Sequence, residues 1–510
     1  MHDCELPDQS DIFAFLADPA THGLCEPVKR IDTHGAAVFL AGKNVYKVKK
    51  AVRFAFMDFS TLAKRREACE RELAVNAANA PCLYLGTVPI SQINSTLNLG
   101  EGGKTVEWAV HMRRFDENQT FDHLAERGEL NLDLIAKLAA AVFESHRRAP
   151  VVSSGNAFPA LRGLAEETLD ALKGDEAFAR EAVMSLRQAM LQAFAHKGKL
   201  LEQREAKGKV RRCHGDLHLR NIAFIEGQPV LFDAIEFDEK IAICDIFYDL
   251  AFLLMDLWTR GLRRHANLLF NRYLWVCDEV EEQIKGLQLL PLFLSLRAAI
   301  RAKVAVLQPG GAQKHAKEAR LYFDAATDFI KSDRPALIAI GGLSGTGKSS
   351  LAALLAGSIG GAPGAIHLRS DVERKRLFHV KEFDRLPEEA YRQEATARTY
   401  RRLRELAAGA LAAGHSVIVD AVHLRQEERA AIEEVARQAY ARFAGLWLAA
   451  PLDLLVKRVD ERQADASDAT RAVVEVQAKH DAGKISWHSL DASKPLEANC
   501  NKATASIPSS

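Results

Sequence analysis

Gly-Leu-Ser-Gly-Thr-Gly-Lys-Ser, at residues 342–349, is the stretch that decides the fold of the C-terminal half of this sequence. It has the eight-residue spacing of a phosphate-binding loop, and it lies between an apolar strand expected at 336–341 and an apolar helix expected at 349–357. Glycines in such a loop let successive backbone N–H groups face a phosphate at the positive end of a helix. We therefore expect a P-loop here.

Two side chains complete this loop. Lys348 supplies a mobile cation for the β- and γ-phosphates and counts as catalytic, and Ser349 offers an oxygen to Mg²⁺. The cofactors expected are therefore ATP and Mg²⁺. The other expected phosphate contacts are Gly342, Ser344, Gly345, Thr346 and Gly347.

Outward from the loop, strands and helices alternate over residues 336–463, which predicts an α/β P-loop NTPase domain with a parallel sheet covered by helices. The polar segment 331–335 ends in proline and precedes the first strand, so we expect a linker there. The P-loop domain is expected at 336–492, followed by a frayed, flexible tail at 493–510.

Two aspartates and two arginines could complete the P-loop site. Asp371 follows a short strand and could orient a substrate hydroxyl, or it could cap the next helix. Asp420 ends the strand 416–420 and could contact magnesium or water, or be satisfied by backbone. Arg458 and Arg462 could close over the transferring phosphate or form a solvated helix face.

Residues 336–490 resemble the P-loop small-molecule kinases that include gluconate kinase, chloramphenicol phosphotransferase and zeta-toxin kinases, within the AAA-type ATPases. The resemblance depends on GLSGTGKSS, on RSD at 369–371, on VIVDA at 417–421 and on the Arg458/Arg462 region. It implies that Asp371 contacts the substrate hydroxyl and that the two arginines contact phosphate.

A second constellation, His-Gly-Asp-Leu-His-Leu-Arg-Asn, lies at 214–221. Asp216 could orient an attacking hydroxyl as the catalytic carboxylate, while Asn221 and the strand-terminal Asp233 could hold Mg²⁺ against nucleotide phosphates. Two other interpretations stay open: a metal pair formed by His214 and His218, and a plain polar loop.

The same site needs a cation, and the strand around residues 45–50 offers Lys47. A helix carboxylate should hold it, and Glu72 or Glu70 fits. The alternative is a solvated basic strand. The strand at 108–112 could supply the hinge that contacts adenine.

Residues 30–325 resemble the aminoglycoside phosphotransferase and choline-kinase-like family, through HGDLHLRN at 214–221 and LFD at 231–233. The resemblance implies an α+β protein-kinase-like domain, placed at 30–330 after an N-terminal extension at 1–29. Asp245 and Asp249 would hold the catalytic loop or bind a cationic substrate. The turn at 33–36 lacks a full set of glycines.

Composition excludes several other classes of protein. Lys and Arg number 68 against 67 Asp and Glu, a net charge of +1, so we expect no nucleic-acid partner. The eight cysteines lack zinc-ligand or redox spacing. The N-terminus lacks a signal-peptide pattern, and aspartates interrupt the apolar stretch 241–258. We expect a cytoplasmic protein without a membrane span.

The two constellations together resemble a bacterial family of bifunctional ATP-binding proteins. They predict an ATP-dependent phosphotransferase with two sites that act on hydroxyl groups of small molecules. Because the turn at 33–36 is poor in glycine, one half could instead be a non-catalytic nucleotide sensor that regulates the other. A third hypothesis is that the P-loop half is an ATPase switch.

Overall fold

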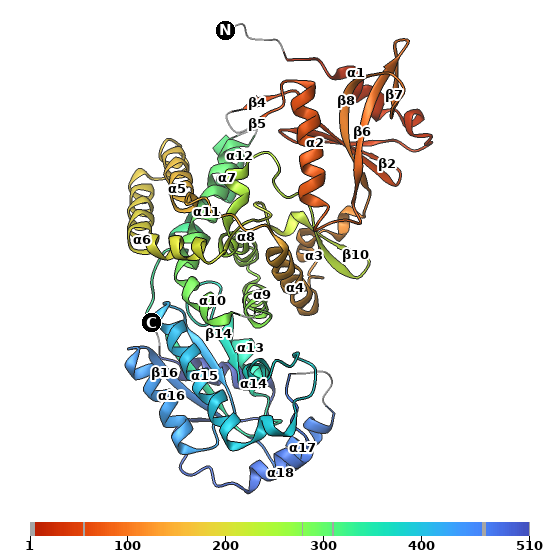
Figure 1. Ribbon diagram of the computed structural model, residues 1–510. Coiled ribbons are helices and arrows are strands. Elements are labelled where there is room, and N and C mark those ends of the chain that lie inside the picture. The colour runs from red at the N-terminus through yellow and green to blue at the C-terminus, as the bar shows by residue number, and fades with distance from the viewer. Residues whose placement is uncertain (1–5, 55–56, 278, 309–310, 462–465, 509–510) are drawn as a thin grey trace. The chain divides into compact units, whose positions relative to one another are not determined.

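The computed structural model describes residues 6–54, 57–277, 279–308, 311–461 and 466–508 (Figure 1). The chain divides into two compact units, Met1–Leu161 with Glu202–Leu253, and Arg162–Leu201 with Leu254–Ser510. The boundary expected at 331–335 does not separate these units. The reason is that α9 (Arg263–Trp275) and α10 (Val280–Gly286), which precede it, pack on helices of the P-loop half.

The first unit contains a six-stranded antiparallel sheet with the order β1-β2-β3-β8-β6-β7. One face packs on α1 and the other on α2, and α2 lies alongside the sheet in Figure 1. The elements are α1 (Ser10–Ala17), β1 (Lys29–Asp32), β2 (Ala36–Ala41), β3 (Asn44–Lys49), α2 (Leu62–Asn76), β6 (Tyr84–Ile93), β7 (Thr96–Leu99) and β8 (Lys104–Arg113).

The expected extension at 1–29 is not separate from this lobe over its described residues. Ile12 and Leu16 of α1 are buried against Phe39 and Tyr46 of the sheet, and the boundary after residue 29 falls inside β1. The apolar spacing of α1 gives it a face that must be covered, and the sheet covers it.

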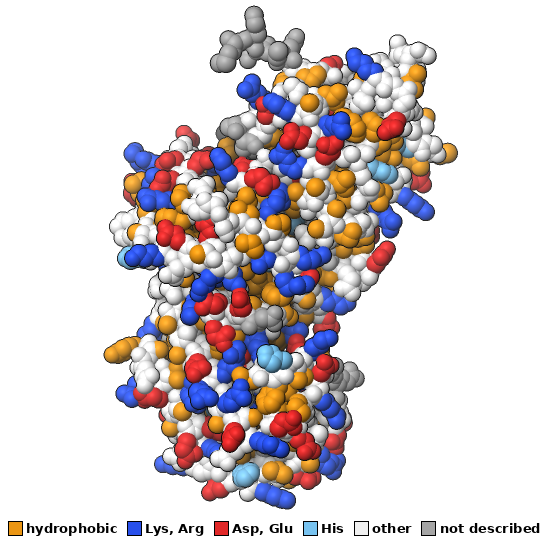
Figure 2. All heavy atoms as spheres, in the orientation of Figure 1, with side chains coloured by type: hydrophobic (Ala, Val, Ile, Leu, Met, Phe, Trp, Pro, Cys, Tyr) orange, Lys and Arg blue, Asp and Glu red, His pale blue; other side chains and the backbone are white. Residues whose placement is uncertain are grey.

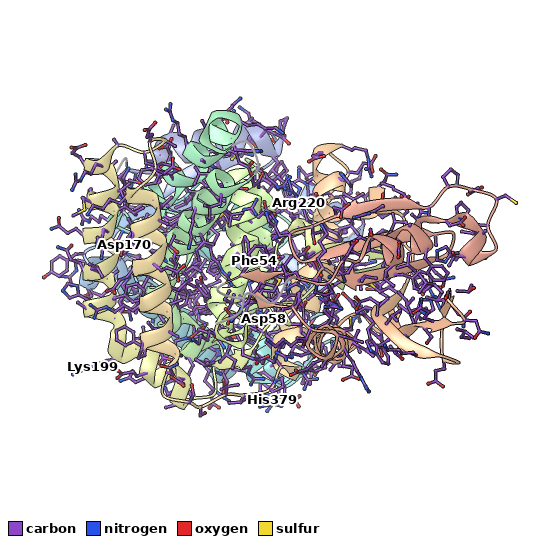
Figure 3. The ribbon with its side chains drawn as sticks, turned by 90° about the horizontal axis from the view of Figure 1, so that it is seen from above. Phe54, Asp58, Asp170, Lys199, Arg220 and His379 are labelled. Carbon is purple, nitrogen blue, oxygen red and sulfur yellow. The ribbon has the colours of Figure 1, made fainter. Side chains whose placement is uncertain are left out.

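The rest of the first unit carries the segment 214–221. The strands β9 (Val210–Arg212) and β12 (Ile243–Asp245) pair before and after it. A hairpin of β10 (Ile222–Ile225) and β11 (Gln228–Leu231) follows it, near the turn that the sequence predicts. The remaining elements are β4 (Arg53–Phe54) and β5 (Met57–Asp58), whose Phe54 and Asp58 are labelled in Figure 3, and α3 (Phe121–Glu126), α4 (Leu132–Arg148), α7 (Glu239–Ala242) and α8 (Ile246–Thr259).

The second unit contains the predicted parallel sheet, with the order β14-β15-β13-β16-β17. Helices cover it, and β13 begins and ends where the apolar run predicts. The fold classes expected for the two halves are therefore confirmed. The strands are β13 (Ala336–Gly341), β14 (Ile366–Arg369), β15 (Val417–Asp420), β16 (Arg442–Ala449) and β17 (His488–Asp491).

The helices not yet named complete the chain. They are α5 (Ala157–Lys173), α6 (Arg180–Ala206), α11 (Leu290–Leu307), α12 (Gly311–Phe329), α13 (Lys348–Ala356), α14 (Ser370–Leu377), α15 (Gln393–Ala412), α16 (Gln426–Gln438), α17 (Leu452–Asp460), α18 (Arg471–Lys479) and α19 (Leu496–Ser506).

The expectation of a frayed tail at 493–510 is wrong for its described residues, because α19 is docked on the sheet core. Leu496, Cys500, Ala503 and Ile507 pack into the cluster that includes Leu351 of α13. Their spacing forms one helical stripe, and burying that stripe offsets the entropy of ordering the segment.

Two surface properties follow from the described chain. None of its helices is both long enough and apolar enough to cross a membrane. On the face drawn in Figure 2, Lys and Arg side chains alternate with Asp and Glu. That mixture agrees with the near-zero net charge.

Two candidate active sites

The loop at 214–221 in the first unit is held in place by a buried aspartate. Asp249 Oδ1 accepts a hydrogen bond from the Gly215 N–H at 2.8 Å, and its Oδ2 accepts one from the His214 N–H at 3.3 Å. Asp245, also buried, pairs with Arg204 at 2.6 Å. Asp249 therefore holds the loop, the first of the two roles left open by the sequence, whereas Asp245 pairs with Arg204.

His214 and His218 do not form a metal pair. His214 Nε2 donates to the Phe232 carbonyl at 2.9 Å, and burial lowers the pKa of His214, so its ring stays neutral. His218 instead caps the short turn 219–221. Arg220 of that turn, labelled in Figure 3, lies 3.6 Å from Asp122.

Among the described residues, the donor atoms of His146, Cys213 and Asp249 lie within 4.8 Å of one another. The Cys213 thiol donates to the Cys244 carbonyl at 3.7 Å. A side-chain hydrogen bond with Cys244 and burial raise the pKa of Cys213 well above its ordinary value. Asp249 of this cluster is already engaged by the backbone N–H groups of His214 and Gly215.

The structure brings Asp216 and Asn221 together. Asn221 Nδ2 donates to Asp216 Oδ2 at 2.9 Å and to the Asp216 carbonyl at 3.0 Å. His218 Nε2 lies 3.3 Å from the same carboxylate, whose side chain remains 38% exposed. The carboxylate is thus oriented while one side stays open to a reactant.

Lys47, Glu72 and Asp233 also meet. Lys47 Nζ lies 2.8 Å from Glu72 Oε1 and 2.7 Å from Asp233 Oδ1. Glu72 is fully buried, whereas the alternative Glu70 is exposed and pairs with Arg66. Burial alone would raise the pKa of Glu72, but Lys47 and its neighbour Lys49 hold that pKa at about 2.

Sequence reasoning missed two members of this charge network. Lys49, only 2% exposed, pairs with Glu72 at 2.5 Å and also with Glu236. Burial raises the pKa of Glu236. Lys49 could have been found from the sequence, because residues 47 and 49 of one strand share a face. No local pattern marks Glu236.

Lys47, Lys49, Asp233 and Glu236 of this network line a cavity of about 600 Å³ in the first unit, together with Asp216. Its other walls are largely apolar, and they include Val38, Leu40, Met112, Phe115 and Phe232. The predicted hinge strand therefore borders it. The turn Thr33–Ala36 also lines the cavity, and the Lys50 ammonium braces that turn through the Thr33 carbonyl at 2.7 Å.

In the second unit, the P-loop lies between β13 and α13 as the sequence predicts. Gly342 has φ +133°, and a Cβ there would lie 2.3 Å from the Leu448 carbonyl oxygen. Gly345 and Gly347 also have positive φ, and Gly347 is the N-cap of α13. Thr346 closes the turn by donating its hydroxyl to the Leu343 carbonyl at 2.8 Å.

The side chains expected around this loop converge at the carboxyl ends of the strands. Lys348 Nζ donates to the Leu343 carbonyl at 2.9 Å, and Ser349 Oγ donates to Asp420 Oδ2 at 2.6 Å. The Ser344 N–H donates to Gln477 Oε1 at 2.9 Å, a contact from α18 that the sequence did not indicate.

Asp420 is buried and ionised. Burial opposes its charge, but His367, Lys348 and Arg369 hold the pKa of Asp420 below its usual range. His367 Nε2 lies 3.4 Å from Asp420 Oδ2. The alternative of an aspartate satisfied only by backbone therefore does not describe Asp420.

Asp371 lies in the first turn of α14, whose N-cap is Arg369, so it is not the capping residue. Desolvation raises the pKa of Asp371 and outweighs the opposite effect of Arg369. Ser467 hydrogen-bonds to its side chain, and Lys348 and Asp420 are close enough to affect its charge. The structure thus places Asp371 beside the P-loop lysine and the strand-end aspartate.

The two arginines expected to close over the phosphate, Arg458 and Arg462, are only partly described. Arg462 lies outside the described residues, and Arg458 Nη1 donates to the Ala492 carbonyl at 2.9 Å. Asp468 accepts hydrogen bonds from the Leu386 N–H at 2.9 Å and from the Tyr391 hydroxyl at 3.0 Å. Since the neighbouring Ser467 hydrogen-bonds to Asp371, the segment after residue 465 contacts that aspartate.

The comparisons with known proteins match two separate parts of the chain. Residues 41–282 match the phosphotransferase enzyme family, and residues 337–481 match a AAA domain family. The chain is 27% identical over 482 residues to an uncharacterized protein of Mycobacterium tuberculosis (strain ATCC 25618 / H37Rv), covering 92% of this chain and 94% of that protein. The same values hold for an uncharacterized protein of Mycobacterium bovis.

Two solved structures are similar to separate parts of the chain. A gluconokinase from Sinorhizobium meliloti 1021 is 20% identical, with 34% of this chain and 91% of that chain covered and a TM-score of 0.25. A choline/ethanolamine kinase family protein from Mesorhizobium loti is 14% identical, with 63% and 98% covered and a TM-score of 0.34. Two separate parts of the chain thus match family models: residues 41–282 match the phosphotransferase enzyme family, and residues 337–481, which contain the P-loop, match a AAA domain.

Proposed function

We propose that this chain is a phosphotransferase with two sites, which uses ATP and Mg²⁺ to phosphorylate hydroxyl groups of small molecules. The observation that carries the proposal is a shared three-part arrangement: a lysine, oxygen donors suited to a metal, and a nearby carboxylate. In the first site the lysine is Lys47, the oxygen donors are Asn221 and Asp233, and the carboxylate is Asp216. In the second site the lysine is Lys348, the oxygen donors are Ser349 and Asp420, and the carboxylate is Asp371.

The donor sets fit Mg²⁺, which prefers oxygen ligands and keeps several waters. Ser349 and Asp420 would hold it in the second site, and their oxygens already lie 2.6 Å apart. Asn221 and Asp233 would hold it in the first, where the Asp233 side chain is 44% exposed. When bound, the ion neutralises charge on the phosphate oxygens.

The residues of the chain would then position the reactants and accept a proton. The acceptor hydroxyl oxygen forms a bond to the γ-phosphorus, the bond from that phosphorus to the bridging oxygen breaks, and ADP leaves. The hydroxyl proton passes to Asp216 or Asp371 and then to water. The raised pKa of Asp371 makes it a stronger proton acceptor than Asp420, whose pKa is lowered.

The first experiment is a screen of sugars, aminoglycosides, nucleosides and amino alcohols with the full chain, with phosphorylated product detected by ³¹P NMR. Asp216→Asn disables the first site and Lys348→Ala the second. Exposed Asp133→Asn and Lys199→Ala serve as matched controls, and Lys199 is labelled in Figure 3.

Each disabled site should lose its own acceptors and leave those of the other unchanged. If both variants retain all ATP turnover, the proposal is wrong. A site that binds nucleotide, transfers nothing and alters the rate of the other would instead be a sensor.

A further inference from the structure

The outer edge of β14 is completed by side chains of a helix that precedes the P-loop domain by about 60 residues in sequence. β14 is an edge strand of the parallel sheet, and its inner side pairs with β15. A bare outer edge would leave N–H and C=O groups unpaired. The helix α9, which lies within the 41–282 match to the phosphotransferase enzyme family, supplies the missing partners.

Three side chains of α9 form a stripe at positions i, i+4 and i+8 against this edge. Asn267 Nδ2 donates to the Pro363 and Ala365 carbonyls, both at 3.0 Å. Asn271 Oδ1 accepts from the His367 N–H at 2.7 Å, and Trp275 Nε1 donates to the His367 carbonyl at 3.0 Å. Both asparagines are buried. Side chains of α9 therefore bind both the N–H and the carbonyl of His367.

The residues fixed in this way lie next to the chemistry. The His367 side chain contacts Asp420, and Asp420 accepts the hydroxyl of Ser349. Trp275 packs edge-on against the His367 ring at 5.6 Å, and the Arg369 guanidinium lies over the indole at the same distance. Arg369 in turn lies 3.9 Å from Asp420. A shift of β14 would therefore move the partners of the expected metal ligand.

We propose that Asn271 and Trp275 are positioning residues of the P-loop site, which is complete only with a helix supplied by the phosphotransferase-family half. They act on Asp420 through His367 and Arg369, and they touch neither nucleotide nor acceptor. Direct partners of a metal ligand, here His367 and Arg369, typically change metal affinity by about 10- to 100-fold when removed, and Asn271 and Trp275 hold these partners in place. The inference builds on the proposed nucleotide site but does not require phosphate transfer.

The test measures how Mg²⁺ changes ATP affinity in the full chain, by calorimetry with and without the ion. The isotherm of Lys348→Ala protein gives the contribution of the first site, which is subtracted. We expect Asn271→Leu to raise the Mg²⁺ concentration for half-maximal effect by about 10-fold or more, with little change in metal-free ATP binding. Trp275→Phe keeps the ring but loses the donor, and should give a smaller shift in the same direction.

Arg264→Ala, on the exposed side of the same helix, is the matched control and should leave the Mg²⁺ dependence unchanged. Trp275→Phe keeps the test valid if the leucine variant fails to fold. Unchanged Mg²⁺ dependence in folded Trp275→Phe and Asn271→Leu proteins would overturn the proposal, as would the absence of Lys348-dependent binding in the wild type. A failure to find any acceptor would count against the proposed function and leave this binding result intact.

Discussion

The two candidate sites differ in which part of the chain would supply positive charge to a phosphate. At the P-loop it comes largely from backbone N–H groups at the start of α13, arranged by glycines with positive φ and assisted by Lys348. In the first unit it comes from Lys47 and Lys49, which are already paired with three carboxylates. The turn at 33–36, which borders that cavity, contains one glycine.

This difference teaches where each site is vulnerable. A backbone cradle fails when a side chain is added to a glycine, because the loop itself must move. A network of buried charges fails when one partner is removed, because the remaining charges lose compensation. We therefore expect glycine substitutions to weaken nucleotide binding mainly in the second unit. Removal of a charged partner should destabilise mainly the first unit.

The largest effect is expected from Asp216→Asn, which tests whether the two sites work independently. An amide cannot take the hydroxyl proton, so transfer at the first site should fall by about 10²- to 10⁴-fold. Nucleotide affinity should hold, because Lys47 and Asn221 remain. Initial rates with an acceptor of the first site measure the loss, with Asp133→Asn as control. An equal fall in the transfer rate at the P-loop site would show that the two sites do not work independently.

Glu72→Gln tests the charge network. Glu72 is fully buried and pairs with both lysines, so its replacement leaves the buried Lys49 and the partly buried Lys47 undercompensated. Breaking such a pair costs about 3–5 kcal/mol of unfolding free energy. Urea unfolding followed by circular dichroism measures it for the first unit. If the free energy of unfolding fell by less than about 1 kcal/mol, water would be stabilising the charges of the two lysines in place of Glu72.

Lowering the pH should remove the contribution that the ionised Glu72 carboxylate makes to the free energy of unfolding. The folded-state pKa of Glu72, about 2, lies below its ordinary 4.5, so the carboxylate stabilises the fold above pH 4.5 and loses that effect as the pH falls toward 2. The shift corresponds to about 3 kcal/mol. The stability gap between wild type and Glu72→Gln should therefore narrow as urea midpoints are taken from pH 6 to pH 3. A constant gap would contradict the assignment.

A pair of glycine substitutions compares the two loops directly. In Gly342→Ala the new Cβ meets a backbone oxygen at 2.3 Å in a positive-φ residue, so the P-loop must distort. Strain of this kind costs about 1–3 kcal/mol, which should weaken ATP binding there by about 5- to 150-fold. In Gly35→Ala the nearest atom is the flexible Met57 Sδ at 2.7 Å, so binding at the first site should change little. Calorimetry measures ATP affinity in both variants. Equal losses of affinity would contradict the expected difference between the two loops.

The sequence predicted the P-loop half closely because its signals are local. An apolar run, a glycine-rich turn and a second apolar run are contiguous, and β13, the loop and α13 follow them. The meeting of Asp216 with Asn221 is also local, since five residues and one short turn separate them. The functional roles of these residues remain predictions.

What the sequence did not predict depends on contacts between distant segments. Glu236 reaches Lys49 across 187 residues, and the Asn267–Trp275 stripe reaches β14 across about 90. Such pairings have no spacing signature, so the packing of α9 and α10 on helices of the P-loop half was not predicted from the sequence. The helix α19 does have a stripe, but its mean polarity concealed it.

The smallest effect is expected from Glu70→Gln, which sharpens the choice between the two helix glutamates. Glu70 is exposed and pairs with Arg66 one turn away, at 2.8 Å and with both side chains about half exposed. Solvent screens such pairs, so the change should cost no more than about 0.5 kcal/mol and leave transfer at the first site intact. The same urea and rate assays apply, with Glu72→Gln alongside. If Glu70→Gln instead lowered the transfer rate as much as Glu72→Gln, the buried Lys47–Glu72 pair would not be the feature that aligns the nucleotide.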